Sequence, residues 1–274
     1  MSAVHAPEGW QAELRLRFAR RGARTYLAHR QHVGPLIVQR TFHPEPHACH
    51  AYIVHPPGGV VGGDRLRLDV EVEQGAHALL TTPAAAKFYR SNGSVAQQTQ
   101  TILVNRGSVE WLPQETIFYR DAQVRSETLV RVSADAKFIG WDIPCLGLPA
   151  RDEPFDSGTL RLHLELWLQN VPLLIDRLRI EGASEARTAL WGLAGYDAIG
   201  TLLAYPADRA LVELARSTIA EQAEFTVTLV DRVLVCRCVS NQAAHVRAVF
   251  IKMWQALRPP MLNCPAVLPR IWAT

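Results

Sequence analysis

Alternation of apolar and polar residues dominates the first two thirds of this 274-residue chain. Every second residue from Trp10 to Leu16 is apolar, and five leucines recur at every second position between Leu160 and Leu168. Because successive side chains of a β-strand point to opposite faces, a period of two predicts strands with one buried face. Similar runs, each bounded by Gly, Pro, Asn or Asp, lie at 78–82, 98–104, 124–132 and 173–180. The pattern predicts many short strands joined by tight turns.

Helical periodicity is confined to the C-terminal part of the chain. The segment Ala207–Gln222 places Leu211, Leu214, Ala215, Thr218 and Ile219 on one stripe, which predicts a first helix. A second predicted helix begins at the N-cap Asn241 and runs to about Leu257. Its predicted inner face consists of Val246, Val249, Phe250, Met253 and Leu257. Pro259-Pro260 is expected to end it, because proline lacks a backbone N–H.

The remaining C-terminal pattern predicts a β-hairpin in which Phe225–Leu229 and Val233–Cys238 pair around a turn at Asp231-Arg232. The chain contains no linker, low-complexity segment or fixed-length repeat. We therefore predict a single domain, residues 1–274, that is mostly β with two helices near the C-terminus. The pattern alone fits a sandwich and a β-solenoid equally well.

Charge and cysteine usage limit the classes of partner. The formal net charge is only +3, from 29 basic and 26 acidic residues, which does not favour nucleic-acid binding. No stretch approaches the roughly 18 apolar residues of a membrane span, and Met1–Glu8 has no apolar signal core. Five cysteines, an odd number, do not form a disulfide framework, so a cytoplasmic location is expected. An arginine cluster at 15–24 fits a solvated strand face or a dock for an acidic partner.

A glycine-rich segment, His55–Asp64, contains two prolines and four glycines and ends on a carboxylate. Proline fixes φ and glycine permits φ > 0, so this segment is a shaped loop and not a regular element. Asp64 would serve either as a polar ligand at a constriction or as a turn-former that accepts backbone N–H bonds. A phosphate-binding loop would need Gly-Lys-Ser/Thr at this point, so nucleotide binding is not expected.

Potential metal ligands are densest just before and within this loop. Imidazole and thiolate groups suit zinc, nickel or copper, but the spacing matches no closed zinc site. Cys49 and His50 are adjacent, so on a strand they point to opposite faces. A purely structural role, transient metal contact and a metal-dependent hydrolase remain open for the cluster His43, His47, Cys49, His50 and His55.

Other reactive or charged side chains have a structural interpretation as well as a functional one. Glu110 and Glu115 could act as an acid–base pair, although no other group converges on them in the sequence. Cys236 and Cys238 are interpreted as buried thiols on one strand face. The segment Lys87–Ser91 combines two cations and two aromatic rings, which fits a protein interface as well as local packing.

Taken together and in order, the motifs resemble the urease accessory protein D family, called H in some systems. The resemblance spans almost the whole chain, although Thr41 and Ala86 depart from the usual proline and threonine, and the region 208–221 matches least. The motifs that carry it are Gly34–Arg40, Cys49-His50, His55–Asp64, Lys87–Ser91, Trp111–Glu115, Gly140–Ile143, Cys145–Arg151, Phe155–Gly158, Leu193–Tyr196 and Pro269–Trp272.

The resemblance implies a maturation chaperone and not an enzyme. Proteins of this family bind apo-urease and accessory protein F, which recruits the GTPase accessory protein G, and the assembly inserts two nickel ions into urease. The resemblance also implies a solenoid-like, β-helix-like stack of short strands, and a water-filled tunnel that carries nickel. No stably bound cofactor is expected, only nickel in transit.

A conduit needs dispersed polar ligands, because each 1.4 kcal/mol of additional binding would slow release about tenfold. On this basis we expect a transient nickel path at Asp64, Asp142 and Glu115, with His50 and His55 nearby. Two rival functions remain open: a metal-dependent hydrolase that uses the His43–His55 cluster, and a structural adaptor through which no metal passes.

Overall fold

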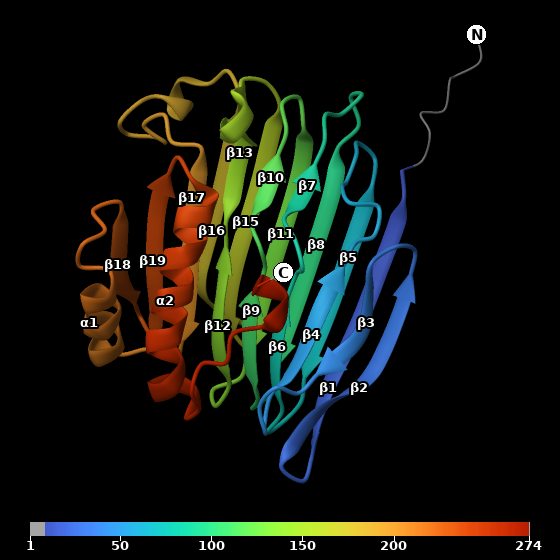
Figure 1. The fold of residues 1–274 in the computed structure, drawn as a ribbon, viewed down its shortest axis with the longest axis vertical. Coiled ribbons are helices and arrows are strands. Elements are labelled where there is room, and N and C mark those ends of the chain that lie inside the picture. Colours follow the sequence, from blue (N-terminus) through green and yellow to red (C-terminus); the bar gives the residue numbers. More distant parts are fainter. Residues whose placement is uncertain (1–8, 274) are drawn as a thin grey trace.

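The computed structural model describes residues 9–273, which form two β-sheets packed face to face, with helices on the outer side of the second (Figure 1). The expected lack of a signal core at Met1–Glu8 concerns residues outside the described part of the chain. Within residues 9–273 no helix is long and apolar enough to cross a membrane.

The first sheet has seven strands in the order β16-β15-β11-β8-β5-β1-β2. The five central strands, β15, β11, β8, β5 and β1, pair in parallel and in register. The edge strands β2 and β16 pair antiparallel with their neighbours. The strands are β1 (Gln11–Arg21), β2 (Arg24–Val33), β5 (Arg65–Val72), β8 (Ala96–Val104), β11 (Gln123–Val132), β15 (Thr159–Leu168) and β16 (Val171–Glu181).

The second sheet has twelve strands and is also mixed, with parallel runs β4-β6-β9-β12 and β7-β10-β13 joined through the antiparallel strand β17. Its strands are β3 (Ile37–Phe42), β4 (Cys49–Val54), β6 (His77–Thr81), β7 (Ala86–Phe88), β9 (Ser108–Leu112), β10 (Thr116–Phe118), β12 (Lys137–Asp142), β13 (Pro144–Leu148), β14 (Glu153–Pro154), β17 (Ala198–Tyr205), β18 (Phe225–Val230) and β19 (Val233–Ser240).

The core lies between the sheets, because the alternating strands turn their apolar faces toward each other. On the first sheet the inward residues form continuous rows across the strands, such as Val70, Ile102, Val130 and Leu166. The outward residues of the same strands are largely charged. Arg15, Arg17, Arg20, Arg21 and Arg24 are all exposed, which fits both a solvated face and a dock for an acidic partner.

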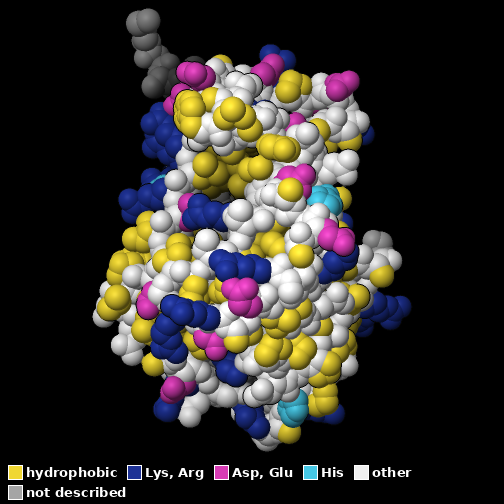
Figure 2. Space-filling view, turned by 90° about the vertical axis from the view of Figure 1, so that its left-hand side faces the viewer, with side chains coloured by type: hydrophobic (Ala, Val, Ile, Leu, Met, Phe, Trp, Pro, Cys, Tyr) yellow, Lys and Arg dark blue, Asp and Glu magenta, His cyan; other side chains and the backbone are white. Residues whose placement is uncertain are grey.

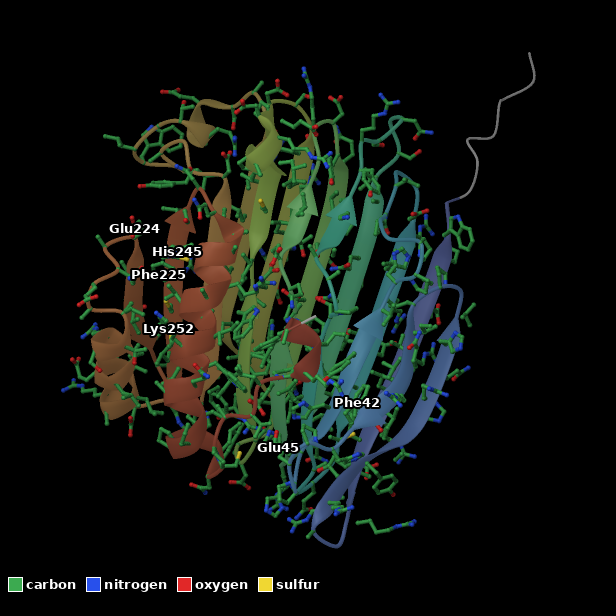
Figure 3. All side chains as sticks on the ribbon, in the orientation of Figure 1. Phe42, Glu45, Glu224, Phe225, His245 and Lys252 are labelled. Carbon is green, nitrogen blue, oxygen red and sulfur yellow. The ribbon has the colours of Figure 1, made fainter. Side chains whose placement is uncertain are left out.

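Two helices and the C-terminal segment cover the outer face of the second sheet (Figure 1). They are α1 (Arg209–Thr218) and α2 (Ala243–Leu262), followed by the short 3₁₀ turn η3 (Arg270–Ala273); two further 3₁₀ turns are η1 (Pro149–Arg151) and η2 (Glu185–Arg187). Phe225 of β18 packs edge-on against His245 and Phe250 of α2, with ring centroids 5.8 and 6.0 Å away (Figure 3).

The mostly β class, the two helices and the hairpin at Asp231-Arg232 are confirmed. The solenoid-like stack is not confirmed, since both sheets are flat mixed sheets that contain antiparallel strands.

Helix boundaries differ from the prediction. Pro259 and Pro260 lie inside α2, which continues to Leu262. The helix tolerates them because the residues on either side, Arg258 and Met261, are buried and fixed by tertiary contacts. Its N-cap is Gln242 and not Asn241.

The buried stripe of the predicted first helix is only partly correct. Ala215 and Ile219 are buried as expected, but the buried residue of the preceding turn of α1 is Val212, while Leu214 is exposed. The inner face of α2 is correct, with Val246, Val249, Phe250, Met253 and Leu257 all buried.

Candidate internal cavity

A cavity of about 340 Å³ lies between the two sheets, and part of its wall is polar. The inward faces of β8 and β11 place two rows of polar residues there. Gln98 is in register with Ser126, and Gln100 with Thr128. Thr128 donates its hydroxyl to Gln100 Oε1 at 2.8 Å. The rows on either side are apolar, so this polar belt interrupts an otherwise hydrophobic core.

The opposite wall is built from segments that follow strands of the second sheet. Thr82 follows β6, Gln114 follows β9, and Asp142 is the last residue of β12. The backbone N–H of Gln114 donates to Thr82 Oγ1 at 2.9 Å and joins two of these segments. Amides and hydroxyls on both walls can hydrogen-bond to water or to the water shell of a small cation.

Sequence reasoning missed Gln98, Gln100, Ser126 and Thr128. The signal was present, because these residues occupy inward positions of strands whose other inward positions are Ala, Ile or Val. A polar residue at such a position costs free energy unless it is hydrogen-bonded or wet, so neighbouring polar pairs indicate a cavity and not a packed core.

The glycine-rich loop lines the cavity through His55, Pro56, Gly58 and Gly59. A side chain at Gly59 would overlap the ring of Tyr89, and one at Gly62 would overlap the Ser91 hydroxyl. Glycine is needed here because the loop passes directly against the segment that follows β7. Burial lowers the pKa of His55 more than the neighbouring Asp64 raises it, which favours neutral imidazole, the form that binds metals.

Asp64 behaves as a turn-former. Its two carboxylate oxygens accept the backbone N–H groups of Trp10 at 2.8 Å and of Val61 at 2.9 Å. The side chain is buried and does not line the cavity. Of the two roles expected for Asp64, polar ligand at a constriction and turn-former, the structure shows the turn-former.

Asp142 is the carboxylate that faces the cavity, and it also lines a smaller cavity of about 30 Å³ beside it. His163 and Asp176 line the smaller cavity. Burial raises the pKa of Asp142 to about 6, opposed by a backbone hydrogen bond at Ile143 and increased by the charge of Asp176. The group can therefore exchange a proton, or offer a carboxylate to a cation, close to neutral pH.

Glu115 and His50 point away from the cavity. Glu115 follows Gln114 and precedes Thr116, which both line the cavity, so its side chain lies on the helical side, where Oε2 is 3.4 Å from Arg247 Nη1 of α2. His50 is fully buried on that same side. Its Nε2 lies 2.7 Å from Glu45 Oε1, and its Nδ1 finds no hydrogen-bond partner among the described residues.

The His43–His55 cluster does not converge. His43 Nε2 lies 3.0 Å from Thr25 O, and His47 Nδ1 lies 3.1 Å from Ala23 O, so both rings hydrogen-bond to backbone carbonyls. Burial raises the pKa of the Cys49 thiol to about 11, which keeps it protonated. Across residues 9–273 no three His, Cys, Asp or Glu side chains are arranged to hold a metal ion.

Glu110 is held in a buried ionic network on the helical side of the second sheet. Arg258 of α2 donates to Glu110 at 2.9 Å and to Glu45 at 2.7 Å, while His77 Nε2 lies 2.6 Å from Glu110 (Figure 3 labels Glu45). Burial would raise the pKa of Glu110, but His77 and Arg258 outweigh it and lower the pKa to about 2. A carboxylate with that pKa is a poor general base, so the Glu110–Glu115 acid–base pair is not formed.

The cysteines are free and mostly buried. Cys236 and Cys238 lie in the core as expected, and burial raises the pKa of Cys236 to about 12. These are inert thiols.

These features define a class: a β-rich protein with a partly polar cavity between its two sheets. The family model for the UreD urease accessory protein matches residues 11–273. This chain is 46% identical over 275 residues to the urease accessory protein UreD of Escherichia coli, covering 97% of this chain and 98% of the relative. It is 43% identical over 269 residues to that of Klebsiella aerogenes, covering 97% and 98%. For the UreD of Citrobacter koseri the identity is 42% over 268 residues, covering 97% and 92%.

The chain belongs to the UreD family of urease accessory proteins. The resemblance predicted from the ordered motifs is confirmed. Membership supports a role in urease maturation alongside urease and other accessory proteins. It also identifies the chain as a chaperone-like protein and not an enzyme, so the hydrolase alternative falls.

Proposed function

We propose that this chain is a cytoplasmic maturation scaffold that binds apo-urease and accessory proteins F and G and passes nickel to urease through the internal cavity. The observation that carries the proposal is the polar belt inside the core, in a cavity whose wall also contains His55 and Asp142. We interpret the repeated parallel strands on either side as a solenoid-like wall around this path.

The chemistry of the wall suits an ion in transit. Neutral amides and hydroxyls are weak nickel ligands, whereas one neutral imidazole and one carboxylate are better ones. Because no third strong ligand converges on them among the described residues, the ion would not be trapped. Each 1.4 kcal/mol of binding that is avoided speeds release about tenfold.

The five predicted path residues divide by position. Asp142 and His55 would contact nickel or its water shell directly. Asp64 would act indirectly by shaping the loop that carries His55. Glu115 and His50 face the helical side, so we propose no direct contact for them in the cavity.

A plug in the cavity tests the proposal in cells that carry the urease operon with this gene deleted. Ser126→Phe adds a ring on the inward face of β11, and Thr101→Phe adds the same ring on the outer face of the same sheet. Complementation with Thr101→Phe should restore nickel-loaded urease, whereas Ser126→Phe should give at least about tenfold less nickel per active site.

The plugged variant must still be recovered in complex with apo-urease at the control level. Full nickel content with Ser126→Phe would exclude the path and leave the rival reading, a structural adaptor through which no metal passes. Full nickel content in the gene deletion itself would exclude the maturation role.

A further inference from the structure

The C-terminal segment after α2, residues 263–273, lies across the outer face of the second sheet (Figure 1). It is fixed at both ends. Arg258 donates to the carbonyl of Pro265, and Trp272 in η3 packs against Trp141 and Trp254 with ring centroids 6.0 and 5.9 Å away. The backbone at Ile271 hydrogen-bonds the Tyr52 phenol of β4.

Trp272 also bonds to the back of the cavity wall. Its indole Nε1–H donates to Thr81 Oγ1 at 2.9 Å, and that hydroxyl donates to the Leu112 carbonyl at 2.6 Å. Thr81 and Leu112 are the last residues of β6 and β9. The residues that follow them, Thr82 and Pro113, line the cavity.

A third wall segment reaches Trp272 through Trp141. The Trp141 ring packs against Trp272, and its own indole N–H donates to the Pro113 carbonyl at 2.7 Å. Asp142 follows directly in the chain and faces the cavity. One side chain therefore contacts, directly or through one hydrogen bond, all three strand ends that carry the second-sheet wall.

These strand ends need such support. The pairing of β6 with β9 ends at Thr81 and Leu112, and Pro83 and Pro113 have no N–H with which to continue it. Beyond that point the segments are held by side-chain bonds, such as the one from the Gln114 N–H to Thr82 Oγ1. Loss of a contact on the outer side of these strand ends would therefore displace the residues that line the cavity.

We propose that Trp272 is a positioning residue for nickel transfer, which fixes the ends of β6, β9 and β12 so that Thr82, Gln114 and Asp142 keep the cavity open. The inference rests on the proposed function of the cavity.

Two substitutions separate the indole hydrogen bond from the ring. Trp272→Phe keeps a ring against Trp141 and Trp254 but removes the N–H, and Trp272→Ala removes both. Trp191→Phe, in an exposed loop, is the matched control. Each full-length chain is studied in its complex with the other accessory proteins.

Amide hydrogen exchange gives the first measurement. Losing one hydrogen bond should speed exchange about five- to tenfold at 81–87 and 112–118 in Trp272→Phe, and more in Trp272→Ala. Exchange in β5 and β11 should not change. Acceleration spread evenly over the protein would show a general stabilising role and overturn the proposal.

Nickel per urease active site gives the second measurement, with nickel limiting. Trp272→Phe should lower it about tenfold with unchanged recovery of the complex. Normal nickel content despite faster local exchange would overturn the positioning role. If the Ser126→Phe plug lowers nickel content in the same cells, only this inference has failed; if the plug has no effect, the proposed path itself has failed.

Discussion

Single polar residues inside the core carry most of the functional information in this protein. Asp142 is the informative case, because its carboxylate is buried at the cavity and its pKa is raised to about 6. An unfolded aspartate has its ordinary pKa near 3.8. The folded state thus keeps a proton that the unfolded state releases between these two values, and folding becomes less favourable as pH rises through this window.

Asp142→Asn should therefore increase the free energy of unfolding, by an amount that depends on pH. We expect no gain below about pH 4, where both states are protonated, and a gain of at most about 3 kcal/mol above pH 6. Denaturant unfolding of wild type and Asp142→Asn at pH 4.5 and pH 7.5 measures this gain in the free energy of unfolding. The control Asp135→Asn, on an exposed carboxylate, should show a pH-independent difference near zero. A constant difference in Asp142→Asn would contradict the raised pKa.

Among the strands and helices, α2 contacts the second sheet through buried charged side chains. Arg258 lies between Glu45 and Glu110, and His77 from β6 and Trp254 from α2 bond to the same Glu110 carboxylate. Removing one member of such a network is costly because it leaves another charge buried and uncompensated.

Glu110→Gln should lower the free energy of unfolding at pH 7 by about 3–5 kcal/mol. Since the pKa of Glu110 is lowered to about 2, its stabilising effect is present above pH 4.5 and is lost as pH falls toward 2. The difference in the free energy of unfolding between wild type and Glu110→Gln should therefore decrease as the pH is lowered from 4.5 to 2. Denaturant unfolding measured over this pH range checks it. Glu213→Gln, which removes an exposed ion pair with Arg216, should change stability by less than about 0.5 kcal/mol.

At the surface of the whole molecule, the loop between β16 and β17 exposes large apolar side chains. Leu190 is 93% and Trp191 is 73% exposed, although the loop around them is held by backbone hydrogen bonds. Figure 2 shows hydrophobic side chains gathered at the upper end of the side that this loop shares with α1 and β18. Exposed apolar surface of this kind promotes association.

The double substitution Leu190→Ser with Trp191→Ser should leave the unfolding midpoint unchanged, because neither side chain is buried. It should reduce self-association of the isolated protein, measured by light scattering against concentration. Leu203→Ser, in the core, should by contrast lower the midpoint strongly. Unchanged scattering in the double variant would show that this loop is not the source of association.

Much of the fold and the family of the protein could be predicted from the sequence. Period-two alternation predicted most strands of the first sheet, and helical periodicity predicted the buried face of α2, because both patterns are local and repeat many times. The edge strand β2 was not predicted, because its burial does not alternate. The glycine-rich loop was recognised for the same reason: the φ values that glycine and proline permit depend on a few consecutive residues. The ordered motifs were sufficient for the family.

Tertiary structure alone decided which side of the second sheet each candidate residue occupies. Alternation makes neighbours face oppositely, but it does not say which face meets the first sheet and which meets α2, and so His50 and Glu115 fell on the helical side. Likewise, Arg258 and Glu45 are 213 positions apart, and Trp272 and Thr81 are 191 apart. No local pattern encodes such partners, because the pairing depends on how separate elements pack once the chain has folded.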